Sequence, residues 1–127
     1  MAVTHPTAVR NLIADAVVDS IDVGGAGSLI FQTSGDSEVA TLTFSSTAFG
    51  AASSGTATAD TITGDSSATG GTVTKFKIQN GSAADAGFAG SVTSTTTSPQ
   101  GDITLTSTTI GAGDTVQVTS LTYTACP

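Results

Sequence analysis

The chain has 127 residues, enough for one compact domain with a single hydrophobic core but not for two. Three basic against ten acidic residues give a net charge of −7. We expect no binding to nucleic acid, because three cations are too few to neutralise the phosphates of its backbone. An anionic membrane surface would repel the chain for the same reason, and no apolar run approaches the roughly 20 residues of a membrane span. One His, one Cys and no Trp leave few reactive groups, which favours a structural protein over an enzyme.

The first segment, residues 7–21, has the apolar spacing of an amphipathic helix. Pro6 suits the first turn, Thr4 or Thr7 can cap the N-terminus, and Gly24-Gly25 ends the helical pattern. The apolar residues that form one stripe along this helix are Val9, Leu12, Ile13, Ala16, Val17 and Ile21.

After Gly27 the apolar spacing changes to two, which predicts β-strands. Asn80-Gly81 predicts a tight hairpin turn with positive φ, and the alternation slips at Thr119-Ser120, which predicts a β-bulge. Lys75 and Lys77 alternate with apolar residues and should share an outward face. The expected strands are 29–31, 40–44, 56–62 (a weaker candidate), 75–78, 88–92, 103–106 and 116–123.

This pattern of short strands and turn-rich stretches predicts a mainly β fold, an antiparallel β-sandwich or jelly roll of seven to nine strands with one N-terminal α-helix. We divide the chain into an N-terminal helical arm, residues 1–27, and a β domain, residues 28–127. Residues 51–71 contain few large apolar side chains and can form a long loop.

Sequence motifs that are catalytic or bind metals in other proteins have simpler interpretations in this chain. Gly-Asp-Ser occurs at residues 35–37 and 64–66, where it is typical of turns, and His5 is the only His that could serve as a base. Glu38 is the only Glu, which argues against a glycosidase. No Asp-x-Asp-x-Asp-Gly loop and no zinc ligand set are present, so we expect no metal and no cofactor and interpret the acids as solvated loop carboxylates.

The aromatic residues and the cysteine complete the set of candidates. Phe31, Phe44 and Phe76 lie on strand-like apolar faces and are predicted core residues. Phe49 and Phe88 lie among Gly and Ala and are the candidates for interface anchors, although the core is favoured for both. Cys126 has no partner for an intramolecular disulfide, and we interpret it as a small apolar residue that closes the last strand.

The start of the chain shows no basic segment followed by an apolar one, so we expect no secretory signal and folding in the cytoplasm. A protein of this kind that acts outside a cell would leave by lysis or by a leaderless route.

The chain resembles small virion proteins of tailed bacteriophages, in an order of segments that runs over nearly its full length. The residues that carry the resemblance are Ala8-Val9-Arg10-Asn11-Leu12-Ile13-Ala14-Asp15, Val39-Ala40-Thr41-Leu42-Thr43-Phe44, Ala48-Phe49-Gly50-Ala51-Ala52, Ala68-Thr69-Gly70-Gly71-Thr72-Val73 with Phe76 and Ile78, Gly90-Ser91-Val92, Gly101-Asp102-Ile103-Thr104-Leu105 and Gly113-Asp114 to Tyr123. None of these segments is catalytic.

The resemblance implies a β-sandwich or jelly-roll protein of the virion, a cement or decoration protein on the capsid surface. Its partner would be the major capsid protein, whose capsomers it would lock together, often as a homotrimer. A rigid β domain without chemistry suits that role. The residues expected at the partner or oligomer interface are Val9, Leu12, Ile13, Val17, Phe49 and Phe88.

We hypothesise that Val9 to Ile21 contributes to anchoring or to trimer contacts. Replacing Leu12 and Ile13 by Asp would then abolish binding and leave a folded β domain, whereas simple unfolding would show that the segment belongs to the core. Two other function classes stay open. A tail, neck or fibre module would differ in copy number, and a cell-surface adhesion or carbohydrate-binding module would need a secretion route.

Overall fold

The computed structural model describes residues 4–94, 103–105 and 107–125. The chain begins with helix α1 (Thr7–Asp19), which passes directly into one 3₁₀ turn, η1 (Ser20–Asp22). Gly24 follows with a φ of +79°, so the predicted glycine stop is confirmed. The strands within the described residues are β1 (Ser28–Gln32), β2 (Glu38–Thr43), β3 (Thr56–Thr58), β4 (Gly71–Thr72), β5 (Lys75–Gln79), β6 (Asp85–Thr93), β7 (Ile103–Thr104), β8 (Thr109–Ile110) and β9 (Thr122–Thr124).

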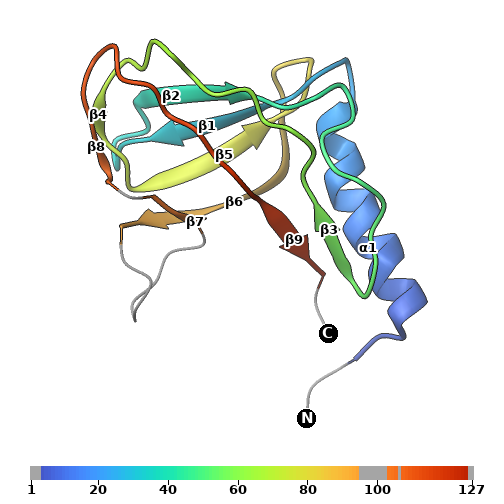
Figure 1. Cartoon of the computed structure of the whole chain (residues 1–127). Helices are drawn as coiled ribbons and strands as arrows, with labels where there is room; N and C mark the ends of the chain where they lie inside the picture. Colours follow the sequence, from blue (N-terminus) through green and yellow to red (C-terminus); the bar gives the residue numbers. More distant parts are fainter. Residues whose placement is uncertain (1–3, 95–102, 106, 126–127) are drawn as a thin grey trace.

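Five of the strands form one sheet in the order β2-β1-β5-β6-β7. Neighbours in this sheet are antiparallel except β6 and β7, which are parallel. Two small antiparallel pairs, β3–β9 and β4–β8, lie beside it, and α1 stands along one side of the molecule against β3, β6 and β9 (Figure 1).

The predicted mainly β fold with one N-terminal helix is confirmed, whereas the sandwich or jelly roll is not. The sheet is of mixed orientation and curls into a half-barrel. Part of the curl has a local cause, because the register shifts between Phe31 and Gln32 in the β1–β2 pair and between Phe76 and Ile78 in the β5–β6 pair. Such irregularities bend a strand and increase its twist.

The core follows the predicted alternation of apolar side chains. Leu29, Phe31 and Leu42 are fully buried, and Phe44 is 2% exposed. On β5 the two lysines are only partly covered and Phe76 and Ile78 are buried, so the predicted outward pair of lysines is confirmed. Each lysine has an acidic partner, Asp36 for Lys75 and Asp85 for Lys77.

The hairpin turn after β5 differs from the prediction. The positive φ falls at Ala83 and not at Gly81. The side-chain oxygen of Asn80 accepts hydrogen bonds from the backbone N–H groups of Ser82 (2.9 Å) and Ala84 (3.1 Å), so the turn is a longer loop closed by an Asn side chain. Gly81 is required for another reason: a Cβ there would lie 2.5 Å from the backbone carbon of Gly24.

The expected final strand is much shorter than its apolar pattern. Only β9 forms a ladder, and Val116 makes an isolated bridge with Asp65. The predicted bulge at Thr119-Ser120 is a bend outside any strand. The loop expected at 51–71 contains β3 and several isolated bridges, and the pair β4–β8 had no counterpart in the prediction.

Candidate interaction surfaces

Polar side chains of α1 and η1 fasten the N-terminal segment to the β domain. The Oδ1 atoms of Asn11, Asp15 and Asp22 accept hydrogen bonds of 2.8 Å from the backbone N–H groups of Gly55, Ala52 and Ala48, respectively. These three acceptors satisfy amides of a loop segment that has few strand partners of its own. The side of the helix that the sequence pattern treats as polar therefore faces the body of the protein.

Apolar contacts lie on the same side of the helix. Ala14, Val18 and Ile21 are at most 1% exposed, and both α1 and η1 contact β6. At the end of the helix, the Ser20 hydroxyl accepts a 2.9 Å hydrogen bond from the Gly87 N–H group. The helix is thus held by carboxylate, amide and hydroxyl groups that surround a few buried apolar side chains.

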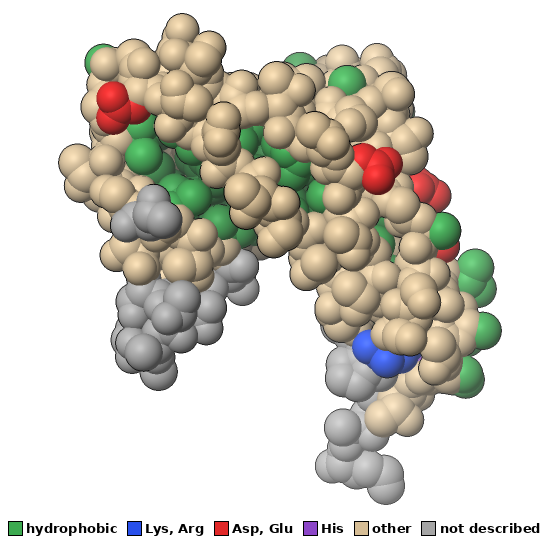
Figure 2. All heavy atoms as spheres, viewed as in Figure 1, with side chains coloured by type: hydrophobic (Ala, Val, Ile, Leu, Met, Phe, Trp, Pro, Cys, Tyr) green, Lys and Arg blue, Asp and Glu red, His purple; other side chains and the backbone are tan. Residues whose placement is uncertain are grey.

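The opposite side of the helix exposes much of the predicted apolar stripe. Leu12 is 69% exposed and Val9 is 38% exposed, and Val23, just after η1, is 57% exposed. Among the described residues these are the large apolar side chains that are exposed. Ile13 and Val17 are half-buried at the border of the stripe. Figure 2 shows hydrophobic side chains along the outer side of the helix, at the lower right.

The two aromatic candidates lie inside the molecule rather than on the helix surface. Phe49 is 3% exposed and belongs to the core. Phe88 is partly buried and contacts three rings, with centroid distances of 6.1 Å to Phe49, 6.0 Å to Phe76 and 5.0 Å to Tyr123. Phe49 is therefore a core residue and Phe88 packs against the core, which is the role that the sequence favoured for both. Phe88 also connects the sheet to the C-terminal strand through Tyr123.

Carboxylates that the sequence suggested to be solvated are instead hydrogen-bonded to the chain. Asp65 accepts the N–H groups of Thr41 (2.9 Å) and Ser67 (2.9 Å), and Glu38 accepts the hydroxyls of Thr41 and Thr69. The first Gly-Asp-Ser copy lies in a turn, as predicted, whereas in the second copy Asp65 forms an isolated bridge with Val116 and only Ser66 lies in a bend. The side-chain hydrogen bond and the charge of Lys75 hold the pKa of Asp36 below its ordinary value of 3.8.

No group of three or more His, Cys, Asp or Glu side chains within the described ranges is arranged to hold a metal ion. In the same ranges the structure contains no helix with the length and hydrophobicity needed to cross a bilayer. Cys126 lies outside the described residues, so its predicted role in the last strand stays a prediction.

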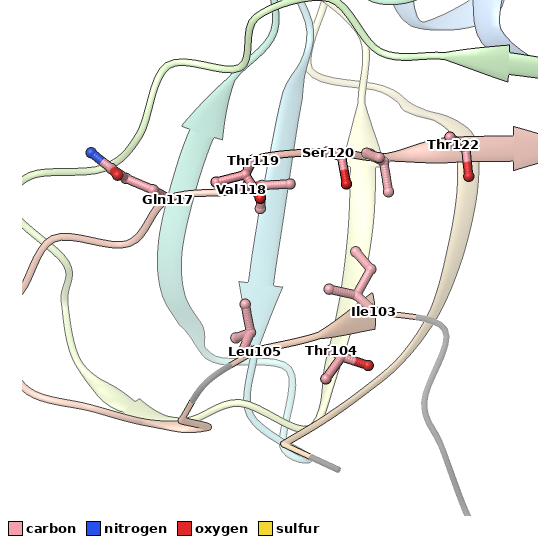
Figure 3. Close-up of a pocket in the computed structure, with 9 residues that line it drawn as sticks. Ile103, Thr104, Leu105, Gln117, Val118, Thr119, Ser120 and Thr122 are labelled. Carbon is pink, nitrogen blue, oxygen red and sulfur yellow. The ribbon is translucent and has the colours of Figure 1, made fainter. Parts of the chain in front are cut away.

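A hollow of about 440 Å³ opens between β7 and the segment that leads to β9. In Figure 3, Ile103, Thr104 and Leu105 lie along one wall, and the second wall is formed by Gln117 to Thr122. A smaller adjoining hollow of about 260 Å³ shares Ile103, Leu121 and Thr122 with the first and reaches Phe88 and Tyr123. Together they form one trough, which we call the seam. Sequence patterns gave no sign of the seam, because it depends on how strands that are distant in the sequence pair with one another.

Comparison of the chain with protein-family models, with curated proteins and with solved structures found no match.

Proposed function

We propose that the protein is a non-enzymatic structural component of a phage virion, a cement or decoration protein that binds the major capsid protein on the head surface and bridges its subunits as a homotrimer. The sequence resemblance supports the virion setting. One structural observation supports the mode of attachment: the exposed large apolar side chains of the described residues, Val9, Leu12 and Val23, all belong to the N-terminal segment.

Exposed apolar side chains that gather in one segment of the chain are typical of a contact site. Burying an exposed Leu side chain contributes roughly 1.5–3 kcal/mol, and many copies on a shell would multiply that contribution. The hydrogen bonds that Asn11, Asp15 and Asp22 accept fix the helix to the β domain, so a force on the helix would be transmitted to the whole molecule. A rigid connection of this kind suits a protein that reinforces a shell.

The attachment is tested with Val9→Gln combined with Leu12→Gln, both on the exposed side of α1. Gln is a good helix former and adds no charge, so the variant should fold like the parent. The matched control is Ser66→Gln with Thr115→Gln, two exposed positions beside the Asp65–Val116 bridge and away from α1. This design improves on Asp at Leu12 and Ile13, because Ile13 is half-buried and its replacement would also disturb the fold.

Co-sedimentation with purified capsids should show loss of binding for the helix variant and normal binding for the control. Equal binding of the two variants would contradict the proposed attachment. The function itself is tested by quantitative mass spectrometry of purified particles. A copy number near that of the major capsid protein supports a shell-wide cement, a handful of copies would move the protein to the neck or tail, and absence from particles would refute the virion role.

A further inference from the structure

The backbone hydrogen bonds can be followed around the molecule almost as a closed ring. The main sheet runs from β7 through β6, β5 and β1 to β2. From β2 the ring continues by the Thr43–Thr63 bridge, whose N–H to O distances are 3.1 and 2.8 Å. The next segment joins the C-terminal segment by the Asp65–Val116 bridge and by the Ala59 N–H group, which donates to the Leu121 carbonyl at 2.8 Å.

The ring is interrupted at the seam. On one side β7 is the last strand of its sheet, and on the other side β9 pairs only with β3 in the described structure. Between Val116 and Leu121, no hydrogen bond to the described residues engages the backbone of Gln117, Val118, Thr119 or Ser120. The segment that carries these groups borders the 440 Å³ hollow, across from β7 (Figure 3).

The composition of the seam restricts what can occupy it. Its nine lining residues around the larger hollow carry no charge, although the whole chain has a net charge of −7. Ile103, Leu105, Val118 and Leu121 supply apolar surface, and the remaining lining residues are Thr, Ser and Gln. Hydrophobic side chains are visible in the recess on this face of the molecule in Figure 2. An uncharged, extended peptide is complementary both to this lining and to the unpaired backbone groups.

We infer that the seam is an acceptor site for a β-strand, filled by an extended, uncharged segment of about five or six residues from a partner protein. The added strand pairs with the Gln117–Ser120 edge and fills the interruption in the ring. The wall from Gln117 to Thr122 contains the bend at Thr119 and is therefore at most roughly 20 Å long, which sets an upper limit on the length of the segment. Apolar side chains of the segment face the hollow and alternate Thr or Ser side chains face solvent.

In the virion setting the donor of this strand is the major capsid protein, and that identification rests on the function proposed above. Strand addition would then supplement the apolar helix contact at a separate site on the molecule. The acceptor site itself is tested without capsids, so its failure and the failure of the virion role give different results.

The first measurement is amide hydrogen exchange of the full-length protein alone. The amides of Val118, Thr119 and Ser120 should exchange much faster than those of Leu29 to Phe31, which lie in the centre of the main sheet. Strong protection of the three amides in the isolated protein would mean that they are already hydrogen-bonded within the chain, and would overturn the inference.

The second measurement is a titration with the peptide acetyl-Thr-Val-Thr-Val-Thr-amide, followed by ¹⁵N NMR. We expect saturable shifts at Gln117–Thr122 and at Ile103–Leu105, and slower exchange of alternate amides between Gln117 and Ser120, because successive N–H groups of a strand point to opposite edges. The same peptide N-methylated at both Val residues keeps its side chains but loses two N–H donors, and should bind about tenfold more weakly or worse. Absence of saturable shifts, or equal binding of both peptides, would overturn strand addition.

A protein variant gives an independent check. Thr119→Pro removes an N–H group that has no partner among the described residues, so the thermal midpoint should stay close to that of the parent while peptide affinity falls about tenfold. Thr115→Pro, four residues earlier and outside the lining, is the control and should bind the peptide normally. Peptide binding by a protein that is absent from particles would refute the virion role and leave the acceptor site intact.

Discussion

Polar side chains in this protein act mainly as acceptors for backbone N–H groups that have no strand partner. Asp15, Asp22 and Asp65 each accept at least one such group at 2.8 to 2.9 Å. A hydrogen bond to a charged acceptor stabilises a fold more than a neutral one does, and losing it leaves a partly buried N–H group unsatisfied. The scatter of acids along the sequence therefore reflects separate local contacts rather than a single acidic surface.

We predict that Asp15→Ala lowers the free energy of unfolding by about 1–2 kcal/mol, because the Ala52 N–H group loses its acceptor. Urea denaturation followed by circular dichroism measures the change. Asp19→Ala is the control: Asp19 is exposed at the last position of α1, near the negative end of the helix dipole, and its removal should cost nothing. Asp15→Asn keeps an acceptor and should recover most of the loss.

The Asp36–Lys75 pair makes a pH-dependent contribution to stability. Lys75 lowers the pKa of Asp36 in the folded protein, so the contribution is fully present above the ordinary Asp value of 3.8. It decreases as the pH falls through the lowered pKa, where the carboxylate becomes protonated. The difference in unfolding midpoint between the parent and Asp36→Asn should therefore be visible at pH 6 and vanish in strong acid. A difference that grows on acidification would contradict this assignment.

At the scale of elements, the helix shows which structural features an apolar pattern predicts and which it does not. The pattern predicted α1 correctly, but it did not predict which side faces the body. Three polar residues that lie off the stripe, Asn11, Asp15 and Asp22, turn toward the β domain because the loop amides there need acceptors. Leu12 and Val9 are exposed as a result. Hydrophobic spacing alone cannot anticipate a helix that docks through hydrogen bonds.

This orientation predicts opposite results for two apolar truncations in α1. Val18→Ala should cost about 2 kcal/mol, because Val18 is 1% exposed and its loss leaves a cavity. Leu12→Ala should change the free energy of unfolding by less than about 0.5 kcal/mol, because the side chain is mostly in water and Ala has a high helix propensity. Denaturation of both variants checks the prediction, and a larger loss for Leu12→Ala would mean that the helix is rotated.

At the scale of the whole molecule, Phe88 joins parts that are far apart in the sequence. It contacts Phe49, Phe76 and Tyr123, so it connects β6 to the loop after β2, to β5 and to the C-terminal strand. The C-terminal segment otherwise meets the sheet across the seam, where β7 and β9 are not paired with each other. The aromatic contact therefore carries much of the packing on that side.

We predict that Phe88→Ala lowers the free energy of unfolding by about 2–3 kcal/mol and loosens the C-terminal strand first. Tyr123 is the only Tyr in a chain without Trp, so its fluorescence reports on this strand. In the parent, unfolding followed by Tyr fluorescence and by circular dichroism should coincide; in Phe88→Ala the fluorescence transition should come earlier. Phe88→Leu keeps apolar volume and should show a smaller separation. Coincident transitions in Phe88→Ala would show that the strand is held by other contacts.

The sequence by itself determined the local features of this protein. The change of apolar spacing from 3.6 to 2 near Gly27 predicted the helix and the central strands, since backbone geometry fixes those periods. The alternation on β5 likewise predicted the buried Phe76 and Ile78 and the outward lysines.

Only the tertiary structure decided how these elements pair and what they leave open. The curled sheet with a parallel β6–β7 pair, the docked side of α1 and the seam beside Gln117–Ser120 all depend on hydrogen bonds between distant residues. Short Thr-rich strands fit a sandwich and a half-barrel equally well, because the sequence of one strand indicates only which of its two faces is apolar. Its neighbours are set by the bends, the loop lengths and the amides that must find acceptors.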